Sequence, residues 1–337
     1  DWIRPDNATL IVTGAMTADA ILPLLEKHFG DWRPAASAPP AKPLPAASRP
    51  TAARVFLIDK PAAVQSNILV GQVTAPSSAA NRLEMGTMND VLGGTFTSRI
   101  NMNLREDKSW SYGARSSLPA ARGERPWLLS APVQTDKTVE SIREIQREIA
   151  EFVGDRPATP AEIDTVRNRD VRALPGRFET NASVGGAIAE MITFGWPDDH
   201  VRTLKSQIEA QTDDGVRAAA KASLVPSQMT WVVIGDLRQI EAPIRQLGLG
   251  DVVLVRPGSA IPVDGEVVEG ESDVNEALLT GESAAVSKTV GEAVIAGAVN
   301  GSEARSPNNC SRSAGDRCCS AASWRSTGIQ RSRRCRS

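Results

Sequence analysis

Hydrophobic and polar positions along the first 250 residues predict alternating strands and helices. Runs with a period near two are typical of strands, and apolar residues spaced three or four apart are typical of amphipathic helices. The clearest helical stripe joins Val139, Ile142, Ile145, Ile149 and Phe152. We expect strands at 8–14, 54–59, 66–73, 111–118, 127–134 and 229–235, and helices at 17–30, up to residue 92, at 97–107, at 137–154 and from 159 to about 222.

An internal echo and several composition shifts predict the domain organisation. NATLIVTGAM (7–16) aligns with QMTWVVIGDL (228–237), and each is followed by a helix that ends in glycine. The echo predicts a duplicated α+β domain, although any strand–glycine–helix unit gives a similar pattern. We expect the last βα unit of a preceding repeat at 1–32, an Ala/Pro linker at 33–52, a whole second copy at 53–249, a small all-β unit at 250–304 and a tail at 305–337.

The charge is unevenly distributed along the chain. The formal net charge is −2, but residues 305–337 carry eight Arg and one Asp, so the other residues carry 30 basic and 39 acidic side chains, a net of −9. An acidic body argues against a nucleic-acid partner, because phosphate binding needs a basic surface. No apolar run approaches the roughly 20 residues of a membrane span. The body has no cysteine and hence no thiolate metal site, since all four lie in the tail: Cys310, Cys318, Cys319 and Cys335.

Residues 92–116, LGGTFTSRINMNLREDKSWSYGARS, hold the only tyrosine of the chain. This segment resembles the signature of the non-catalytic half of pitrilysin/insulinase-type zinc peptidases, the inverzincins, and the flanking sequence from residue 1 to 250 fits the same family. The resemblance implies an α+β fold, namely a pitrilysin/mitochondrial-processing-peptidase-like α/β sandwich in which helices pack on an antiparallel sheet. In that family two homologous halves close around a peptide.

The resemblance also implies a role for Arg105 and Tyr112, which match a family pair by type and by their spacing of seven. Such a guanidinium and phenol stabilise the tetrahedral intermediate by donating hydrogen bonds to the oxygen on which charge develops. The alternative is structural. Arg105 would then be a solvated residue at a helix end near Glu106 and Asp107, and Tyr112 would pack on a strand.

The zinc ligands of this family are missing from the sequence. The metal-bearing half carries His-x-x-Glu-His, whereas the two histidines here, His28 and His200, begin no such motif. We expect His28 near a helix C-terminus, where the helix dipole favours its charge, and His200 to be exposed at a helix start. The resemblance therefore implies no metal or cofactor in this chain, and zinc in a homologous partner half.

A second resemblance begins at residue 250, where short apolar runs alternate with turn dipeptides such as Pro257-Gly258 and Asp264-Gly265. Through RPGSAIPVDG and TGES this segment resembles part of the actuator domain of heavy-metal P-type ATPases. The resemblance implies that Glu282 activates water at a phosphorylated Asp in another domain. The chain has no Asp-Lys-Thr-Gly motif, so we expect the loop to be inactive here, and an ordinary surface turn is the alternative. The loop comprises Thr280, Gly281, Glu282 and Ser283.

The two parts join without a polar linker at QLGLGDVVLV, which indicates a fusion. We expect the strand at 251–255 either to fold poorly or to attach loosely to the first domain. The tail at 305–337 has eight Arg, eight Ser and no apolar periodicity, so we expect it to be disordered. An Arg- and Cys-bearing arm that binds metal or nucleic acid is the alternative.

These patterns lead to one hypothesis and two alternatives. The leading hypothesis is the non-catalytic half of a pitrilysin-type metallopeptidase, which forms a wall of the peptide chamber, supplies Arg105 and Tyr112 to a zinc-bearing half, and hydrolyses no peptide alone. The alternatives are a fragment of a heavy-metal P-type ATPase and a catalytically silent structural member of the peptidase family. The peptidase resemblance implies the periplasm or cell envelope, and the actuator resemblance implies the cytoplasmic face of a membrane.

Overall fold

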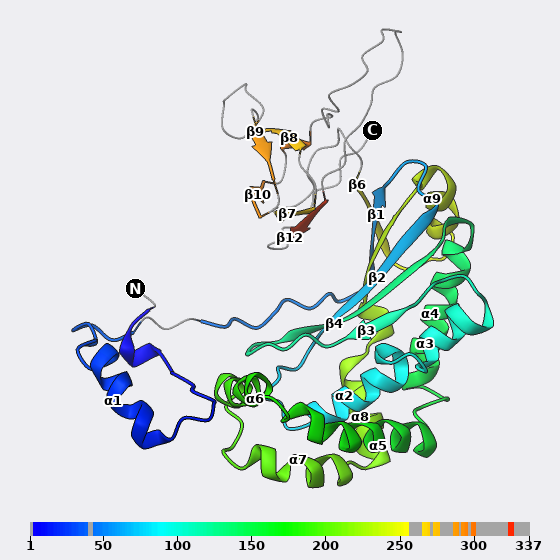
Figure 1. Ribbon diagram of the computed structural model, residues 1–337. Coiled ribbons are helices and arrows are strands. Elements are labelled where there is room, and N and C mark those ends of the chain that lie inside the picture. The colour runs from blue at the N-terminus through cyan, green and yellow to red at the C-terminus, as the bar shows by residue number, and fades with distance from the viewer. Residues whose placement is uncertain are drawn as a thin grey trace.

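A computed structural model describes residues 3–39, 43–255, 265–269, 272–276, 286–289, 291–295, 298–300 and 323–326. Its main body is a six-stranded sheet with helices packed on it (Figure 1). The order of the strands is β3-β4-β2-β5-β1-β6. Their bounds are β1 (Arg54–Asp59), β2 (Gln65–Thr74), β3 (Arg115–Ser117), β4 (Arg125–Gln134), β5 (Thr230–Gly235) and β6 (Asp251–Val255).

The sheet is mixed in direction. The neighbours from β3 to β5 pair antiparallel, as the sequence predicts, whereas β1 pairs in parallel with both β5 and β6. Parallel strands need a crossover connection, and helix α9 (Leu237–Arg245) supplies it between β5 and β6. The sheet is therefore antiparallel from β3 to β5, as predicted, and parallel from β5 through β1 to β6.

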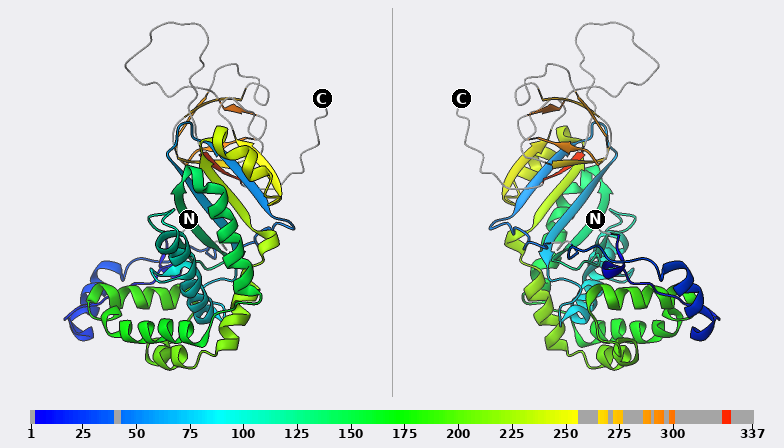
Figure 2. Two further views of the ribbon diagram at one scale, coloured as in Figure 1. Left: turned by 90° about the vertical axis from the view of Figure 1, so that its right-hand side faces the viewer. Right: turned by 90° about the vertical axis from the view of Figure 1, so that its left-hand side faces the viewer.

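Burial alternates along the strands, so one face of the sheet carries the core. In β4, Trp127 and Leu129 are buried while Leu128 is 42% exposed. The helices gather on the buried face (Figure 2). Of the predicted stripe on α4 (Thr138–Val153), four residues from Ile142 to Phe152 lie within the core and Val139 packs against it. The remaining helices of the body are α2 (Arg82–Asn89), α3 (Arg99–Asn101), α4 (Thr138–Val153), α5 (Pro160–Arg177), α6 (Asn181–Phe194), α7 (His200–Glu209) and α8 (Asp213–Ser223), with π-helical turns η2 (Asp90–Gly94) and η3 (Met102–Asp107) and 3-10 turns η4 (Thr135–Lys137) and η5 (Pro226–Gln228).

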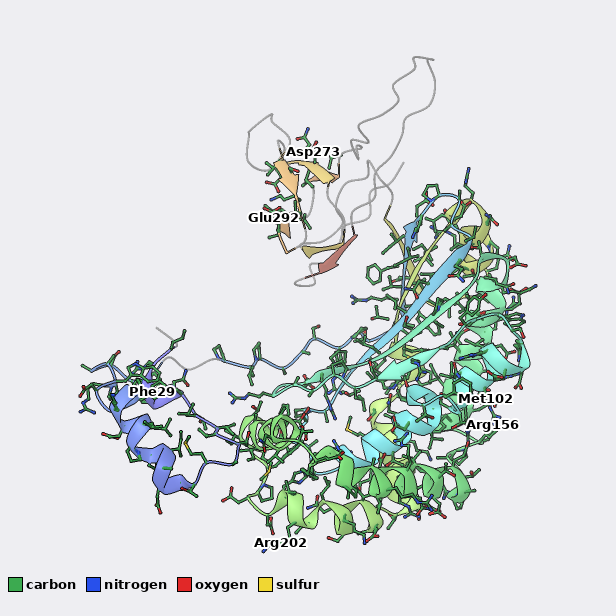
Figure 3. The ribbon with its side chains drawn as sticks, viewed as in Figure 1. Phe29, Met102, Arg156, Arg202, Asp273 and Glu292 are labelled. Carbon is green, nitrogen blue, oxygen red and sulfur yellow. The ribbon has the colours of Figure 1, made fainter. Side chains whose placement is uncertain are left out.

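The N-terminal unit contains the predicted helix but not the predicted strand. After the short η1 turn (Pro5–Asn7), residues 8–14 form no strand, and helix α1 (Ala18–Phe29) follows. The strand prediction is wrong because an extended segment needs a paired neighbour, and Leu10 and Val12 are instead 58% and 50% exposed. Thr13 Oγ1 donates to the carbonyl of Asn181 on α6 at 2.9 Å. Figure 3 shows Phe29 well away from the sheet.

The junction at residue 250 is ordered. Strand β6 pairs with β1 over five positions, from Arg54↔Asp251 to Ile58↔Val255. The strand therefore attaches to the first domain, as one of the two expectations states, because the edge of β1 offers unpaired backbone groups that a following strand can use; that the attachment is loose stays a prediction. Gly250 has φ +135°, and a Cβ there would clash with the Ala53 carbonyl. A glycine is thus required where the chain enters β6.

The described residues after β6 form short strands in two three-stranded sheets, ordered β10-β7-β12 and β11-β8-β9. The sequence predicts disorder for the tail; the structure describes four of its residues, which form β12 antiparallel to β7. No helix among the described residues is long and apolar enough to span a bilayer. The strands are β7 (Gly265–Glu269), β8 (Ser272–Asn275), β9 (Val286–Lys288), β10 (Ala293–Val294), β11 (Val299–Asn300) and β12 (Ser323–Ser326).

Candidate functional site

Arg105 and Tyr112 lie on either side of a backbone reversal at Ser109. Arg105 belongs to the η3 turn, and Ser109 adopts a left-handed φ of 57°. The Ser109 N–H donates to the Arg105 carbonyl at 3.0 Å, and the Trp110 N–H donates to the Leu104 carbonyl at 2.9 Å. These two backbone hydrogen bonds fix the path of the chain between the two candidate residues.

Both candidate side chains reach solvent. The Arg105 guanidinium lies 4.8 Å from the Phe96 ring centroid, its Nε lies 3.2 Å from Glu106 Oε1, and its side chain is 39% exposed. Tyr112 is 85% exposed, so the alternative in which it packs on a strand is wrong. Arg105 does lie at a helix end beside Glu106, as the structural alternative requires, but an exposed ion pair of this kind is weak. Both donors can therefore reach a ligand from outside.

Asn101 joins the two halves of this loop, and the sequence analysis missed it. Its side chain is almost fully buried; its Nδ2 donates to the Phe96 carbonyl at 2.5 Å, and its Oδ1 accepts from the Ala114 N–H at 3.0 Å. One amide thus links the segment that contacts Arg105 to the segment that follows Tyr112. Asparagine in a buried helical position was the available signal, since buried amides are nearly always hydrogen-bonded.

A second asparagine anchors the same turn to helix α4. Asn103 Nδ2 donates to Glu144 Oε2 at 2.9 Å and to Glu148 Oε1 at 2.8 Å. Burial acts to raise the pKa of Glu144, but the hydrogen bond from Asn103 and the charge of Lys108 hold it below its ordinary value. Figure 3 shows Met102 of η3 and Arg156, which follows α4, on the same side of the molecule. The loop therefore rests on a charged, hydrogen-bonded support.

The loop is also attached to the end of β4. Ser111 forms a β-bridge with Val133, and the Gln134 N–H donates to the Trp110 carbonyl at 3.0 Å. Across the sheet face opposite the helices, partly buried apolar side chains lie in register from strand to strand. Leu69 pairs with Val232, and Val232 pairs with Phe56. The loop that carries the two donors is thus attached to β4, a strand of the sheet that also bears this apolar face.

Neither histidine contributes to a metal centre in the described residues, where no group of three His, Cys, Asp or Glu could hold an ion. His28 lies in the last turn of α1, as predicted. The prediction that His200 is exposed is wrong, because this first residue of α7 is only 5% exposed. Helix α6 ends at Gly195 with φ +66°, and the chain turns so that the His200 ring lies 4.6 Å from the Trp196 ring. The described residues therefore offer no set of ligands that fits zinc.

The actuator loop Thr280, Gly281, Glu282 and Ser283 lies outside the described residues. Close to it in sequence, Lys288 Nζ lies 3.1 Å from Glu276 Oε1, and both side chains are largely shielded from solvent. The role of Glu282 therefore stays a prediction.

Two family matches divide the chain. Residues 1–169 match the family described as the Peptidase M16 inactive domain, and residues 224–306 match the P-type ATPase actuator domain. Strands β5 and β6 fall in the second range yet belong to the same sheet as β1 to β4. The structure therefore forms one sheet from residues of both matched ranges.

Solved structures share the fold of the larger part. An M16 inactive domain from Pseudomonas fluorescens superimposes with a TM-score of 0.53 at 22% identity, covering 59% of this chain and 46% of that one. A protease from Helicobacter pylori gives a TM-score of 0.60 at 16% identity, covering 66% of this chain and 54% of that one. The fold and the match over residues 1–169 place the larger part of this protein in the class of inactive, peptidase-like domains. The chain belongs to the Peptidase M16 inactive-domain family.

The second part is similar to metal-transporting ATPases. A copper-exporting P-type ATPase B from Archaeoglobus fulgidus is 53% identical over 78 residues, which is 23% of this chain and 11% of that protein. A probable copper-exporting P-type ATPase from the same organism is 41% identical over 100 residues, 12% of its length. The chain spans about a tenth of the length of these curated relatives.

Proposed function

We propose that the sheet domain acts as the non-catalytic half of a two-part metallopeptidase and supplies Arg105 and Tyr112 to a zinc-bearing homologous half. The observation that supports this most is the exposure of both donors on one loop whose backbone is fixed to η3 and β4. A pair that served only packing would not leave a phenol 85% exposed. The partner half would hold the metal, because the described residues offer no ligand cluster.

In this proposal the two side chains act on charge that develops during the reaction. The attack of water on a peptide carbonyl places negative charge on the carbonyl oxygen, and the guanidinium and phenol donate hydrogen bonds to it. Arg105 would leave the exposed Glu106 for this oxygen at small cost, since surface ion pairs contribute about 0–1 kcal/mol. Both groups then contribute more in the transition state than in the bound substrate.

The open sheet face fits a peptide in an extended conformation. Partly buried Phe56, Leu69 and Val232 form an apolar band across neighbouring strands. Such a band offers contacts to alternate side chains of an extended segment, whose residues point to opposite sides with a period of two. The domain would thereby form one wall of a peptide chamber.

The proposal is tested by adding a zinc-bearing homologous half and measuring peptide hydrolysis. This chain alone is expected to hydrolyse no peptide. In the mixture, Arg105→Ala and Tyr112→Phe are each expected to lower kcat about 10²- to 10³-fold with little change in KM, because an oxyanion donor acts in the transition state. Arg202→Ala is the matched control, because Arg202 is an arginine of α7 with an 83% exposed side chain and lies far from Met102 of η3 in Figure 3.

Two outcomes would contradict the proposal. Zinc-dependent hydrolysis by this chain alone would show that it needs no partner. A mixture that binds peptide but is indifferent to both substitutions would favour a catalytically silent structural member, which holds a partner without chemistry.

The similarity to copper-exporting ATPases supports a second candidate function for the region after β6. Here Glu282 would promote hydrolysis of an aspartyl phosphate in a partner ATPase. The test is to add this chain to a phosphorylated P-type ATPase that lacks its own actuator domain. Faster dephosphorylation that Glu282→Gln abolishes would support this function, and no acceleration would exclude it.

The two candidate functions imply different cellular compartments for this protein. The peptidase proposal places the protein in the periplasm or cell envelope, and the actuator alternative places it at the cytoplasmic face of a membrane. Cell fractionation with an antibody to the sheet domain separates the two.

A further inference from the structure

A cavity of about 490 Å³ lies on the helical side of the molecule, and neither Arg105 nor Tyr112 lines it. Its lining residues come mainly from α2, the end of α5, α6, α7 and the start of β4, and these elements can be located in Figure 1. This volume lies within the range of 300–1,000 Å³ that is usual for small-ligand sites. Three arginines and three aromatic rings are among its walls: Arg82, Arg125, Arg177, Phe178, Phe194 and Trp196.

Two of the arginines are held by neutral partners. Arg125 is only 7% exposed; its Nε donates to the Ala75 carbonyl at 3.1 Å and its Nη1 to Ser77 Oγ at 3.2 Å. Arg82 Nη2 donates to His200 Nδ1 and to Gln207 Oε1, both at 3.2 Å. Burial lowers the pKa of Arg82 and of Arg125. Both guanidinium groups are thus partly withdrawn from water, and neither forms an ion pair with a described residue, although the charge of Glu84 acts on Arg82 and opposes the effect of burial.

The charge of the cavity is unbalanced. In the part of the chain that the structure describes, none of the three arginines has a carboxylate oxygen within 4.0 Å, and Arg177 makes no side-chain hydrogen bond. The one carboxylate in the wall is Glu190 on α6; Glu84 on α2 and Asp199 before α7 lie outside the wall. For the buried Arg125 and the partly buried Arg82 the lack of a paired carboxylate is costly, because desolvation disfavours the charged form, whereas Arg177 is exposed. An anionic ligand would offset this cost.

The aromatic residues of the wall indicate which chemical group of the ligand would lie beside its carboxylate. The Arg82 guanidinium lies 5.0 Å from the Trp196 ring centroid, and Phe194 lies 5.3 Å from Trp196, centroid to centroid. Trp196 Nε1 donates to the Ser77 carbonyl at 3.2 Å, which fixes the indole. A rigid aromatic surface thus stands beside the guanidinium groups. This arrangement suits an apolar side chain adjacent to a carboxylate.

We propose that the cavity binds the C-terminal residue of a peptide, with its carboxylate at Arg82 and Arg177 and its apolar side chain against Phe194 and Trp196. Carboxylates accept paired hydrogen bonds from the planar guanidinium fork. That the ligand is a peptide, and not a small hydrophobic acid of the same chemistry, rests on the peptide-binding function proposed above. The cavity would then hold one end of a substrate or product.

The test uses the full chain and a fluorescein-labelled hexapeptide that ends in leucine, followed by fluorescence anisotropy. The free-carboxylate peptide is expected to bind at least about tenfold more tightly than its amidated form, since a charge-assisted contact is lost in the amide. Arg177→Gln is expected to weaken binding about fivefold, and Glu190→Gln to tighten it about twofold to fivefold. Arg172→Gln is the matched control, because Arg172 is an exposed arginine of the same helix outside the cavity wall and should leave binding unchanged.

Equal affinity for the two peptides, or indifference to both Arg177→Gln and Glu190→Gln, would overturn the site. Competition by hexanoate with an affinity equal to that of the peptide would overturn the peptide assignment. The measurement needs no zinc-bearing half. Failure here therefore leaves the trans-activity proposal intact, and failure of trans-activity with binding preserved removes that proposal but not this site.

Discussion

Arg82 Nη2 lies 3.2 Å from His200 Nδ1, at the boundary of α2 and α7. Because arginine only donates, Nδ1 of the imidazole must accept, and the proton of the neutral ring is on Nε2. Burial, followed by the positive charges of Arg82 and Arg177, lowers the pKa of His200, while Asp199 acts in the opposite direction. The contact therefore fixes the tautomer, while burial and the two arginines together disfavour the charged ring.

We expect His200 to titrate below the ordinary value of 6.5 in the folded protein. As the pH falls, His200 in the unfolded chain takes up its proton at a higher pH than His200 in the folded protein does. The free energy of unfolding therefore decreases as the pH falls below 6.5. Proton NMR of the His28→Asn variant, which retains a single imidazole, measures the midpoint directly. The same variant in urea should titrate near 6.5. A folded midpoint at or above that value would contradict the assigned environment.

Glu162 should make the free energy of unfolding depend on pH in the acidic range. It accepts from Arg99 Nε at 2.7 Å and Nη2 at 2.6 Å and completes the capping box of α5. Burial acts to raise its pKa, but the hydrogen bonds from Arg99 and Thr159 lower it from 4.5 to about 2. This depressed acid contributes stability above pH 4.5 that is lost as the pH falls toward 2.

Glu162→Gln tests this contribution, because glutamine retains the cap but not the charge. With its side chain one-third exposed, we expect a loss of about 1–2 kcal/mol in the free energy of unfolding at pH 7, after a discount for solvent screening. Urea unfolding at pH 7 and at pH 3 measures the difference, which should shrink at the lower pH. Glu179→Gln, at an exposed position, should show neither effect. A difference that does not depend on pH would argue against the ion pair.

Gly93 lets the η2 turn approach β3. A Cβ there would lie 2.5 Å from Ser116 Oγ and 2.9 Å from Ser116 Cβ, in a buried region. We expect Gly93→Ala to lower the free energy of unfolding by about 1–3 kcal/mol through overpacking. Gly86→Ala in helix α2 has open space and should raise it by about 0.5–1 kcal/mol. Thermal unfolding of both variants checks the opposite signs, and a neutral Gly93→Ala would show that this contact yields easily.

The attachment of β6 to β1 should depend on Gly250. Gly250→Ala places a Cβ against the Ala53 carbonyl and is expected to speed hydrogen exchange of the amides in β1 and β6 at least about tenfold, since their pairing would open more often. Gly248→Asn is the control, because φ +62° with open space suits asparagine. Hydrogen-exchange mass spectrometry of the full chain measures both. Unchanged protection in Gly250→Ala would mean that the strands pair without the close approach.

The sequence by itself determined the elements of the sheet domain. The alternation in 54–59 and 229–235 and the stripe from Val139 to Phe152 appear as predicted, because local periodicity decides which face of an element is apolar. The resemblance carried by residues 92–116 also identified the loop that exposes Tyr112. These features depend on residues close together in the chain.

Only the tertiary structure decided the features that depend on distant partners. Residues 8–14 have the composition of a strand but form none, because no strand lies beside them. Residues 251–255 do form a strand, because they pair with the edge of β1. His200 looked exposed beside two aspartates, yet the turn after Gly195 directs it toward Arg82, more than a hundred residues earlier. Pairing, burial and the charge of a cavity wall are properties of groups that the fold brings together, so no local pattern could reveal them.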